Sequence, residues 1–248
     1  MHSEEWIYGL NPVLEALSSG RNIQALYVLS GMHEGSVLIR NRAEKRGIPL
    51  KVVEKFFFDT RFPKGHQGVA ARVVQKGYVS LDELLIIPPK RNETPLFIVL
   101  DGIEDPRNLG AILRAADATG AHGVVIQSHR SARLSPEVGK ASSGAIEYVP
   151  VSMVVNIKHA IQRMKDKEIT IIGAEAGNHP VMWETDFTVP LALVVGSEGK
   201  GMRKTVIGNC DHIVSLPLRG KINSLNVSVA TGVLLYEIMR QRFFPVLA

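Results

Sequence analysis

The chain has 248 residues, 45% of them hydrophobic, and a formal net charge of +5, which suits one large domain or two smaller ones. Its single cysteine, Cys210, excludes a disulfide framework and has no CxxC partner, so we expect a structural role for it. No apolar run approaches the roughly 20 residues of a membrane span, and the N-terminus lacks the pattern of a secretory signal. The histidines show no metal-binding spacing. These features predict a cytoplasmic protein without a structural metal.

Residues 1–76 form a predicted small α/β unit in which strands alternate with helices. The pattern predicts strands over 25–29, 50–53 and 69–74, and helices over 12–19, 36–46 and 56–60. This part holds 11 Lys and Arg against 7 Asp and Glu, hence +4, whereas residues 77–248 hold 18 against 17, hence +1. A basic N-terminal unit indicates a polyanionic partner.

Four loop residues of this unit are candidates for phosphate contacts: Arg21, Lys64, His66 and Gln67. A solvated polar loop explains any one of them about as well. Residues 77–94 follow as a predicted linker, with a short capped helix early in it and a polar, proline-bearing stretch at its end.

From Pro95 onward the α/β pattern is stronger, and we expect a second domain over 95–248. Strands are predicted over 96–100, 123–127, 170–175, 191–196 and 212–216, helices at about 107–119, 135–143, 154–166, 203–208 and 224–242, and a further short strand within 144–151. A strand-then-helix order predicts a mostly parallel sheet covered on both faces.

Three apolar strands of this domain end in polar, glycine-bearing loops, near residues 101–108, 196–201 and 216–228. In an open α/β sheet, ligands bind where loops leave the carboxyl ends of strands, so three such loops predict one composite site. The last loop feeds the C-terminal helix, which Asn223 or Ser224 could cap. An ordinary capped helix explains one Ser or Asn there, but poorly explains four within six residues, because each is a mediocre helix former.

Two common nucleotide motifs, GxGxxG and GxxxxGK[ST], are absent from these loops. Their absence argues against a Rossmann enzyme for a small molecule, which would also have no use for a basic appended domain. Asn108 is instead placed at a helix start, with Arg114 six residues later among apolar neighbours. Because an unpaired buried charge is costly, Arg114 is expected to contact either an acid such as Glu198 or Asp117, or an anion inside the site.

The three loops together resemble the SpoU (TrmH) family of RNA ribose 2′-O-methyltransferases, within the SPOUT superfamily. The family motifs match residues 108–114, 196–201 and 216–228, and the resemblance covers roughly residues 95–242. It implies S-adenosylmethionine as the methyl donor, a homodimer, and a deep C-terminal trefoil knot.

The N-terminal part is similar to the L30e-like RNA-binding domain of the same family, on the evidence of residues 8–13 and 66–69. Among family members, the whole chain is most similar to the bacterial 23S rRNA guanosine-2′-O-methyltransferases. The resemblance therefore implies 2′-O-methylation of a ribose in structured RNA, foremost a guanosine of 23S rRNA. A tRNA substrate is the alternative.

The resemblance also assigns residues to this chemistry. It implies an active site made of Arg114, Asn108, Glu198, Ser224 and Asn226. It implies a cofactor pocket made of Gly196, Gly201, Leu216 and Leu225. A free guanidinium has a pKa above about 12, so stabilising the forming alkoxide and holding a phosphate suits Arg114 better than acting as a general base. Glu198 is expected to orient polar neighbours, and Asn226 and Ser224 to position substrate or phosphate. Methyl transfer itself needs no metal.

A non-catalytic RNA-binding protein with a decayed methyltransferase domain is the competing function. Decay should have removed Arg114, Glu198 or Asn226, and all three are present. The dimer has separate support in the C-terminal helix, whose apolar surface is wider than one core-facing stripe needs and comprises Leu225, Val229, Val233, Leu234, Tyr236 and Ile238. Burial of that helix within one subunit is the alternative.

Overall fold

The computed structural model describes residues 4–31 and 34–244, and the chain divides into two compact units. The first unit comprises the chain up to Gly77 together with residues 133–148. The second comprises residues 78–132 and the chain from Val149 onward. The chain therefore leaves the first unit, returns to it for one short segment, and leaves it again.

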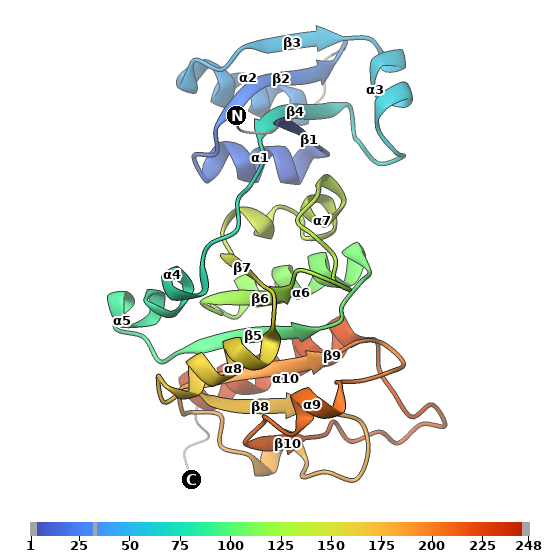
Figure 1. Ribbon diagram of the computed structural model, residues 1–248. Helices are drawn as coiled ribbons and strands as arrows, with labels where there is room; N and C mark the ends of the chain where they lie inside the picture. The colour runs from blue at the N-terminus through green and yellow to red at the C-terminus, as the bar shows by residue number, and fades with distance from the viewer. Residues whose placement is uncertain (1–3, 32–33, 245–248) are drawn as a thin grey trace. The chain divides into compact units, whose positions relative to one another are not determined.

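The first unit is a mixed sheet in the order β1-β4-β2-β3 (Figure 1), with β1 (Glu4–Tyr8), β2 (Ile23–Leu29), β3 (Leu50–Val53) and β4 (Val69–Val74). β4 runs antiparallel to β1 and β2, whereas β3 runs parallel to β2. One face carries α1 (Leu10–Ser18) and α2 (Glu34–Arg46), and the other carries α3 (Lys55–Arg61). Because side chains alternate along a strand, Ile7 packs in the aliphatic core with α1, and Trp6 and Tyr8 pack among the aromatic residues with α3.

The returning segment holds α7 (Pro136–Ala141) and a 3-10 turn, η1 (Ala145–Glu147). The strand predicted within 144–151 is wrong over most of its length. Gly144 has a left-handed φ of 94° that starts the 3-10 turn, which an extended strand residue would not adopt. Pro150 then precedes the actual strand, β7 (Val151–Val154).

The second unit is a six-stranded sheet in the order β10-β8-β9-β5-β6-β7, and every pairing is parallel. Besides β7 it contains β5 (Leu96–Asp101), β6 (Gly123–Gln127), β8 (Thr170–Ala174), β9 (Leu191–Gly196) and β10 (His212–Val214). The predicted parallel sheet is confirmed. All residues of β5 and β9 are buried, as expected for central strands with both faces covered.

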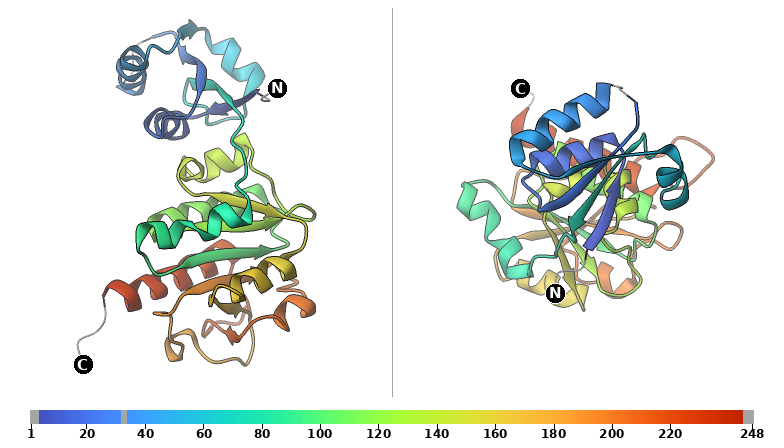
Figure 2. Two further views of the ribbon diagram at one scale, coloured as in Figure 1. Left: turned by 60° about the vertical axis from the view of Figure 1, so that its left-hand side comes forward. Right: turned by 90° about the horizontal axis from the view of Figure 1, so that it is seen from above.

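Helices cover both faces of this sheet (Figures 1 and 2). On one face α6 (Pro106–Ala118) packs against α10 (Val227–Phe243). On the other face lie α4 (Leu81–Leu85), α8 (Ile157–Lys165) and α9 (Lys204–Ile207), and a short η2 (Met182–Glu184) follows β8. No helix in the described ranges is long and apolar enough to cross a membrane.

Residues 77–94, expected as a linker, contain α4 and α5 (Ile87–Arg91). Ser80 caps α4 by accepting a hydrogen bond from the Glu83 N–H at 3.2 Å, and the Glu83 carboxylate accepts one from the Ser80 N–H at 2.7 Å. Leu84, with the other leucines of α4, is buried in the core of the second unit. Helix packing thus begins before residue 95. The domain boundaries 1–76 and 95–248, like the trefoil knot, stay predictions.

Candidate active site

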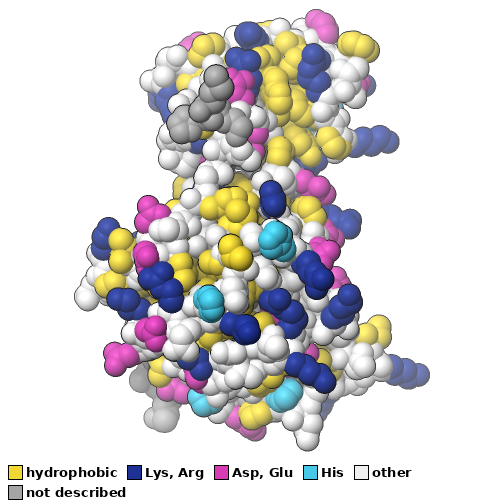
Figure 3. Space-filling model, in the orientation of Figure 1, with side chains coloured by type: hydrophobic (Ala, Val, Ile, Leu, Met, Phe, Trp, Pro, Cys, Tyr) yellow, Lys and Arg dark blue, Asp and Glu magenta, His cyan; other side chains and the backbone are white. Residues whose placement is uncertain are grey.

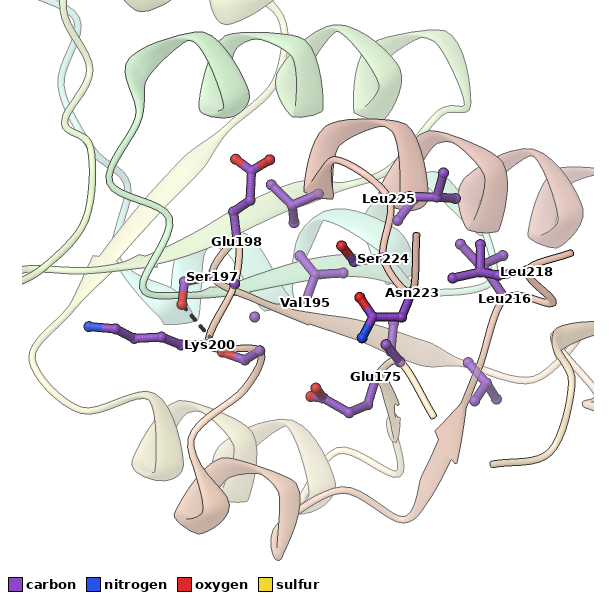
Figure 4. A pocket seen from close by; sticks show the side chains of 18 residues that line it. Glu175, Val195, Ser197, Glu198, Lys200, Leu216, Leu218, Asn223, Ser224 and Leu225 are labelled. Carbon is purple, nitrogen blue, oxygen red and sulfur yellow. Dashed lines mark hydrogen bonds between the residues drawn. The ribbon is translucent and has the colours of Figure 1, made fainter. Parts of the chain in front are cut away.

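The four strands β5, β8, β9 and β10 are parallel and end at one edge of the sheet. A cavity of about 350 Å³ lies at this edge (Figure 4), within the size range of ligand sites. Its walls come from the ends of β8, β9 and β10 and from the two loops that follow β9 and β10. Five predicted residues line it together with Glu198: Gly196, Gly201, Leu216, Ser224 and Leu225. The composite site expected from the three loops therefore forms in part around one cavity.

A hydrogen-bonded network joins one residue from each of the three loops. The Asn226 Nδ2 donates to Asn108 Oδ1 at 3.0 Å and to Glu198 Oε1 at 3.5 Å, and Asn108 Nδ2 donates to Glu198 Oε2 at 3.3 Å. In Figure 4 the Glu198 side chain points toward the helices above the loop and away from Glu175. The carboxylate thus holds two amides from distant parts of the chain in fixed orientations.

Asn226 also caps α10, which corrects the predicted cap at Asn223 or Ser224. Its Oδ1 accepts hydrogen bonds from the N–H groups of Ser228 and Val229, at 2.9 and 3.3 Å. Since Nδ2 donates to Asn108 and Glu198, both the oxygen and the nitrogen of the Asn226 amide have hydrogen-bond partners within the protein. Asn226 therefore ties the start of α10 to Asn108 of α6 and to Glu198.

Two substitutions of Asn226 should distinguish its role as the N-cap of α10 from its role in the hydrogen-bonded network. Asn226→Asp keeps a good N-cap oxygen but removes the donor and places a second carboxylate beside Glu198. Asn226→Ala removes both functions and should also lower the free energy of unfolding by about 1 kcal/mol. We expect both variants to lose methyl transfer by about tenfold or more, because the buried side chain of Asn108 loses the donor to its Oδ1 and Glu198 loses one of the two amides that it orients. A wild-type rate for Asn226→Asp, measured in single turnover, would show that only the cap matters.

Two glycines allow the loop after β9 to close tightly. A Cβ on Gly196 would lie 2.1 Å from both the Gly201 carbonyl carbon and the Met202 nitrogen. Gly201 has a φ of 64°, and a Cβ there would lie 2.2 Å from Glu175 Oε1. Ser197 and Gly201 exchange backbone hydrogen bonds of 3.1 and 2.9 Å across the turn. Backbone packs on backbone here, which only glycine permits.

Two acidic residues support this loop and were not predicted. Asp101 is almost completely buried at the end of β5, and accepts from Arg203 Nε at 2.7 Å and from the Arg203 N–H at 2.8 Å. Glu175, directly after β8, lines the cavity and accepts from the Met202 N–H at 3.1 Å. Both follow parallel strands at the site edge, and that position is the signal that could have identified them.

Arg114 has a different environment from the one expected. It lies on α6 but is exposed, so the argument that burial forces a partner on it is wrong. The apolar neighbours Ile112 and Leu113 turn into the core instead. Arg114 does not line the cavity, and this leaves it on the outer side of the helix that carries Asn108.

The four RNA-contact candidates of the first unit are mostly engaged within it. Arg21 is buried and forms ion pairs with two carboxylates, Glu5 and Glu147. His66 stacks on Phe58 and accepts from the Gly68 N–H, and Gln67 Oε1 accepts from the N–H of Leu10 at the start of α1. Lys64 differs from the other three, because its exposed side chain makes no hydrogen bond or ion pair with residues 4–31 or 34–244. These placements favour structural roles for three of the candidates.

Cys210 is half-buried, and its burial raises the pKa of its thiol to about 11. A thiol of that pKa is almost entirely protonated at neutral pH and is a poor nucleophile, in agreement with the structural role expected for it. In the ranges 4–31 and 34–244, no group of three His, Cys, Asp or Glu side chains is arranged to hold a metal ion.

A glycine-walled cavity and a polar network lie at the carboxyl edge of a parallel sheet, which is where open α/β proteins bind their ligands. Comparison with known proteins identifies the family to which the chain belongs. Residues 95–236 match the SpoU rRNA methylase family, and residues 6–79 match the RNA 2′-O ribose methyltransferase substrate-binding domain. The Bacillus subtilis protein YacO, assigned to the TrmH family of tRNA/rRNA methyltransferases, is 41% identical over 96% of each chain.

Solved structures agree with this assignment. The AdoMet complex of the SpoU methyltransferase AviRb from Streptomyces viridochromogenes has a TM-score of 0.81 at 25% identity, and covers 96% of this chain and 90% of its own. An AdoMet-bound rRNA methyltransferase from Sinorhizobium meliloti has a TM-score of 0.78 at 25% identity, with 97% and 88% covered. The A. aeolicus TrmH/SpoU tRNA modifying enzyme has a TM-score of 0.56 at 30% identity, with 65% and 82% covered.

The chain belongs to the SpoU family of methylases. It is an RNA ribose 2′-O-methyltransferase that takes its methyl group from S-adenosylmethionine. The family resemblance of the three motif loops is thereby confirmed.

Proposed function

We propose that the RNA is ribosomal and that the methylated residue is a guanosine of 23S rRNA, modified in the cytoplasm. The proposal that the RNA is ribosomal rests on the share of this chain that each solved structure covers. The structure of an rRNA methyltransferase covers 97% of this chain, both units included, whereas that of a tRNA modifying enzyme covers 65%. The choice of guanosine is supported by the resemblance of the motif loops. A tRNA substrate remains the alternative.

The cavity suits S-adenosylmethionine in shape and chemistry. Its glycines leave backbone groups accessible, Leu216 and Leu225 offer apolar walls, and the Glu175 carboxylate suits a cationic ligand. We propose that these residues hold the cofactor together with Gly196 and Gly201. When bound, it supplies an electrophilic methyl group.

The remaining predicted residues act on the RNA ribose in this proposal. Arg114 stabilises the oxyanion that forms as the 2′-hydroxyl loses its proton, and holds an adjacent phosphate, because a guanidinium donates in a planar fork. The network of Asn108, Glu198 and Asn226 keeps α6, and hence Arg114, in register with the cofactor loop. Ser224, exposed at the cavity, is the candidate for a direct contact to substrate. Positioning of this kind can supply much of a rate enhancement.

Mapping of the methylated nucleotide tests the substrate. RNA from a strain that lacks the gene is incubated with the purified protein and labelled S-adenosylmethionine, and the labelled ribose is located by sequencing. Label on one guanosine of 23S rRNA is the expected result. Label confined to tRNA would establish the alternative, and absence of label from all RNA would contradict the proposed function.

We further propose a homodimer that forms through α10. Of the apolar residues expected on its surface, Leu234 and Ile238 are buried in their own unit. The others remain exposed along one helical face, with Val229 at 52%, Val233 at 40% and Tyr236 at 53%, preceded by Leu225. Contiguous exposed apolar residues of this kind usually need a partner.

Val233→Asp should dissociate this dimer, because it places a charge in the middle of the apolar face. Asp and Val have similar helix propensities, so α10 itself should persist. Sedimentation equilibrium at micromolar concentration should show twice the chain mass for the wild type and a shift toward the single-chain mass for the variant. Val155→Asp, at an exposed apolar site elsewhere in the second unit, is the matched control. A monomeric wild type with full activity would contradict the proposal.

A further inference from the structure

The face of the first unit that carries α3 has an unusual composition. The opposite face is an aliphatic core, whereas this one combines rings with cations. Its accessible part, taken together with Phe56 of α3, is here called the aromatic face. It comprises three half-buried residues, Trp6, Phe57 and Arg72, and three exposed ones, Lys51, Phe56 and Arg61. α3 has seven residues and covers only part of the sheet. Figure 3 shows hydrophobic side chains gathered on this unit with Lys and Arg side chains at their margin.

A stacked column runs through the aromatic face. The rings of Tyr27 and Phe57 are nearly parallel, at 9° and 5.1 Å between centroids. The Arg61 guanidinium carbon lies 4.4 Å from the Phe57 centroid, and Arg61 is exposed. Trp6 contacts Tyr27 at 4.8 Å in a tilted arrangement. The column therefore ends in a planar cation that faces solvent.

Phe56 lies on α3 beside Phe57, on the same helix as Arg61. Its side chain is 77% exposed, although the next residue but one, Phe58, is fully buried. Exposure of a phenyl ring to this degree has no packing benefit, so it suits a ring that meets a ligand. The aromatic face thus offers two exposed planar groups, Phe56 and the Arg61 guanidinium.

The cations of the aromatic face are incompletely neutralised. Neither Lys51 nor Arg61 forms an ion pair with a described residue, and the Lys51 Nζ lies 5.6 Å from the centroid of the Tyr27 ring. Arg72 faces Glu4 at 3.6 Å, which is too long for a hydrogen bond, and its Nε–H has no acceptor there. A nearby carboxylate, Asp59, is paired with His66. An anionic ligand would supply the negative charge that these three cations lack.

We propose that the aromatic face binds unpaired nucleotides of the RNA, with bases stacked on Phe56 and on the Arg61 guanidinium. Lys51 and Arg72 contact the flanking phosphates. Aromatic and guanidinium planes are the usual stacking partners of unpaired RNA bases. A protein partner fits less well, because the cores of protein interfaces are depleted in charge. The inference rests on the proposed function only in taking RNA as the ligand.

The test compares two RNA hairpins that share a stem, one with a loop of unpaired nucleotides and one closed into continuous duplex. Binding to the full-length protein is measured by fluorescence anisotropy. Phe56→Ala and Arg61→Gln should each weaken binding of the looped hairpin by roughly tenfold, and duplex binding much less. Controls are Val155→Ala, at a side chain 75% exposed, and Lys45→Gln, which removes the same charge from α2 on the opposite side of the sheet.

A second readout reports whether RNA binds near Trp6, within the aromatic face. The chain has two tryptophans, so Trp183→Phe leaves Trp6 as the only one. Its fluorescence should change on addition of the looped hairpin and much less with the duplex. Looped-hairpin affinities of Phe56→Ala and Arg61→Gln equal to those of the controls would overturn the inference. They would leave the proposed function intact, because that function is decided separately by methyl transfer from S-adenosylmethionine to RNA.

Discussion

Gly196→Ala should abolish detectable binding of S-adenosylmethionine. The added Cβ would lie 2.1 Å from the backbone of Gly201 and Met202, and backbone atoms cannot move away by changing a rotamer. The loop of residues 197–203 would have to shift, and with it the wall of the cavity. Isothermal titration calorimetry with the cofactor measures the loss directly, since it does not depend on RNA.

Gly208→Ala is the matched control for this experiment. It lies in the same unit, and its Cβ would meet only Lys204 O, at an ordinary 3.5 Å. Circular dichroism should show that both variants keep their secondary structure. Wild-type cofactor affinity in folded Gly196→Ala would show that the closed loop is not needed for the cofactor.

Arg114→Ala should lower the rate of methyl transfer by about 10²–10³-fold, the usual loss when one oxyanion-stabilising donor is removed. Affinity for S-adenosylmethionine should stay close to the wild-type value, because Arg114 does not line the cavity. Single-turnover measurements with saturating RNA isolate the chemical step from binding.

Two further variants define what Arg114 does. Arg114→Lys retains the charge but not the planar fork, so recovery of activity would indicate a purely electrostatic role. Arg107→Ala removes an exposed arginine of the same helix that pairs with Asp105, and should change the rate little. Turnover of Arg114→Ala near the wild-type rate would exclude Arg114 from the reaction.

Local pattern was sufficient for most of the helices and strands and for the loops that surround the cavity. The apolar runs of β5 and β9 indicated buried parallel strands, because a strand covered on both faces is apolar throughout. The strand-then-loop pattern located the loops around the cavity, and the family resemblance of those loops singled out Gly196, Gly201, Leu216 and Leu225, all four of which line it. These properties depend on residues near one another in the chain, which is what a sequence displays.

Tertiary structure alone decided which side chains are brought together and which are exposed. The partners that decide the roles of Asn226 and Arg21 are Asn108, 118 residues away, and Glu147, 126 residues away. Arg114 was expected to be buried because its neighbours in sequence are apolar, but they lie on the other side of α6. Contacts between distant segments leave no periodic trace, since they depend on how elements pack rather than on the order of residues within one element.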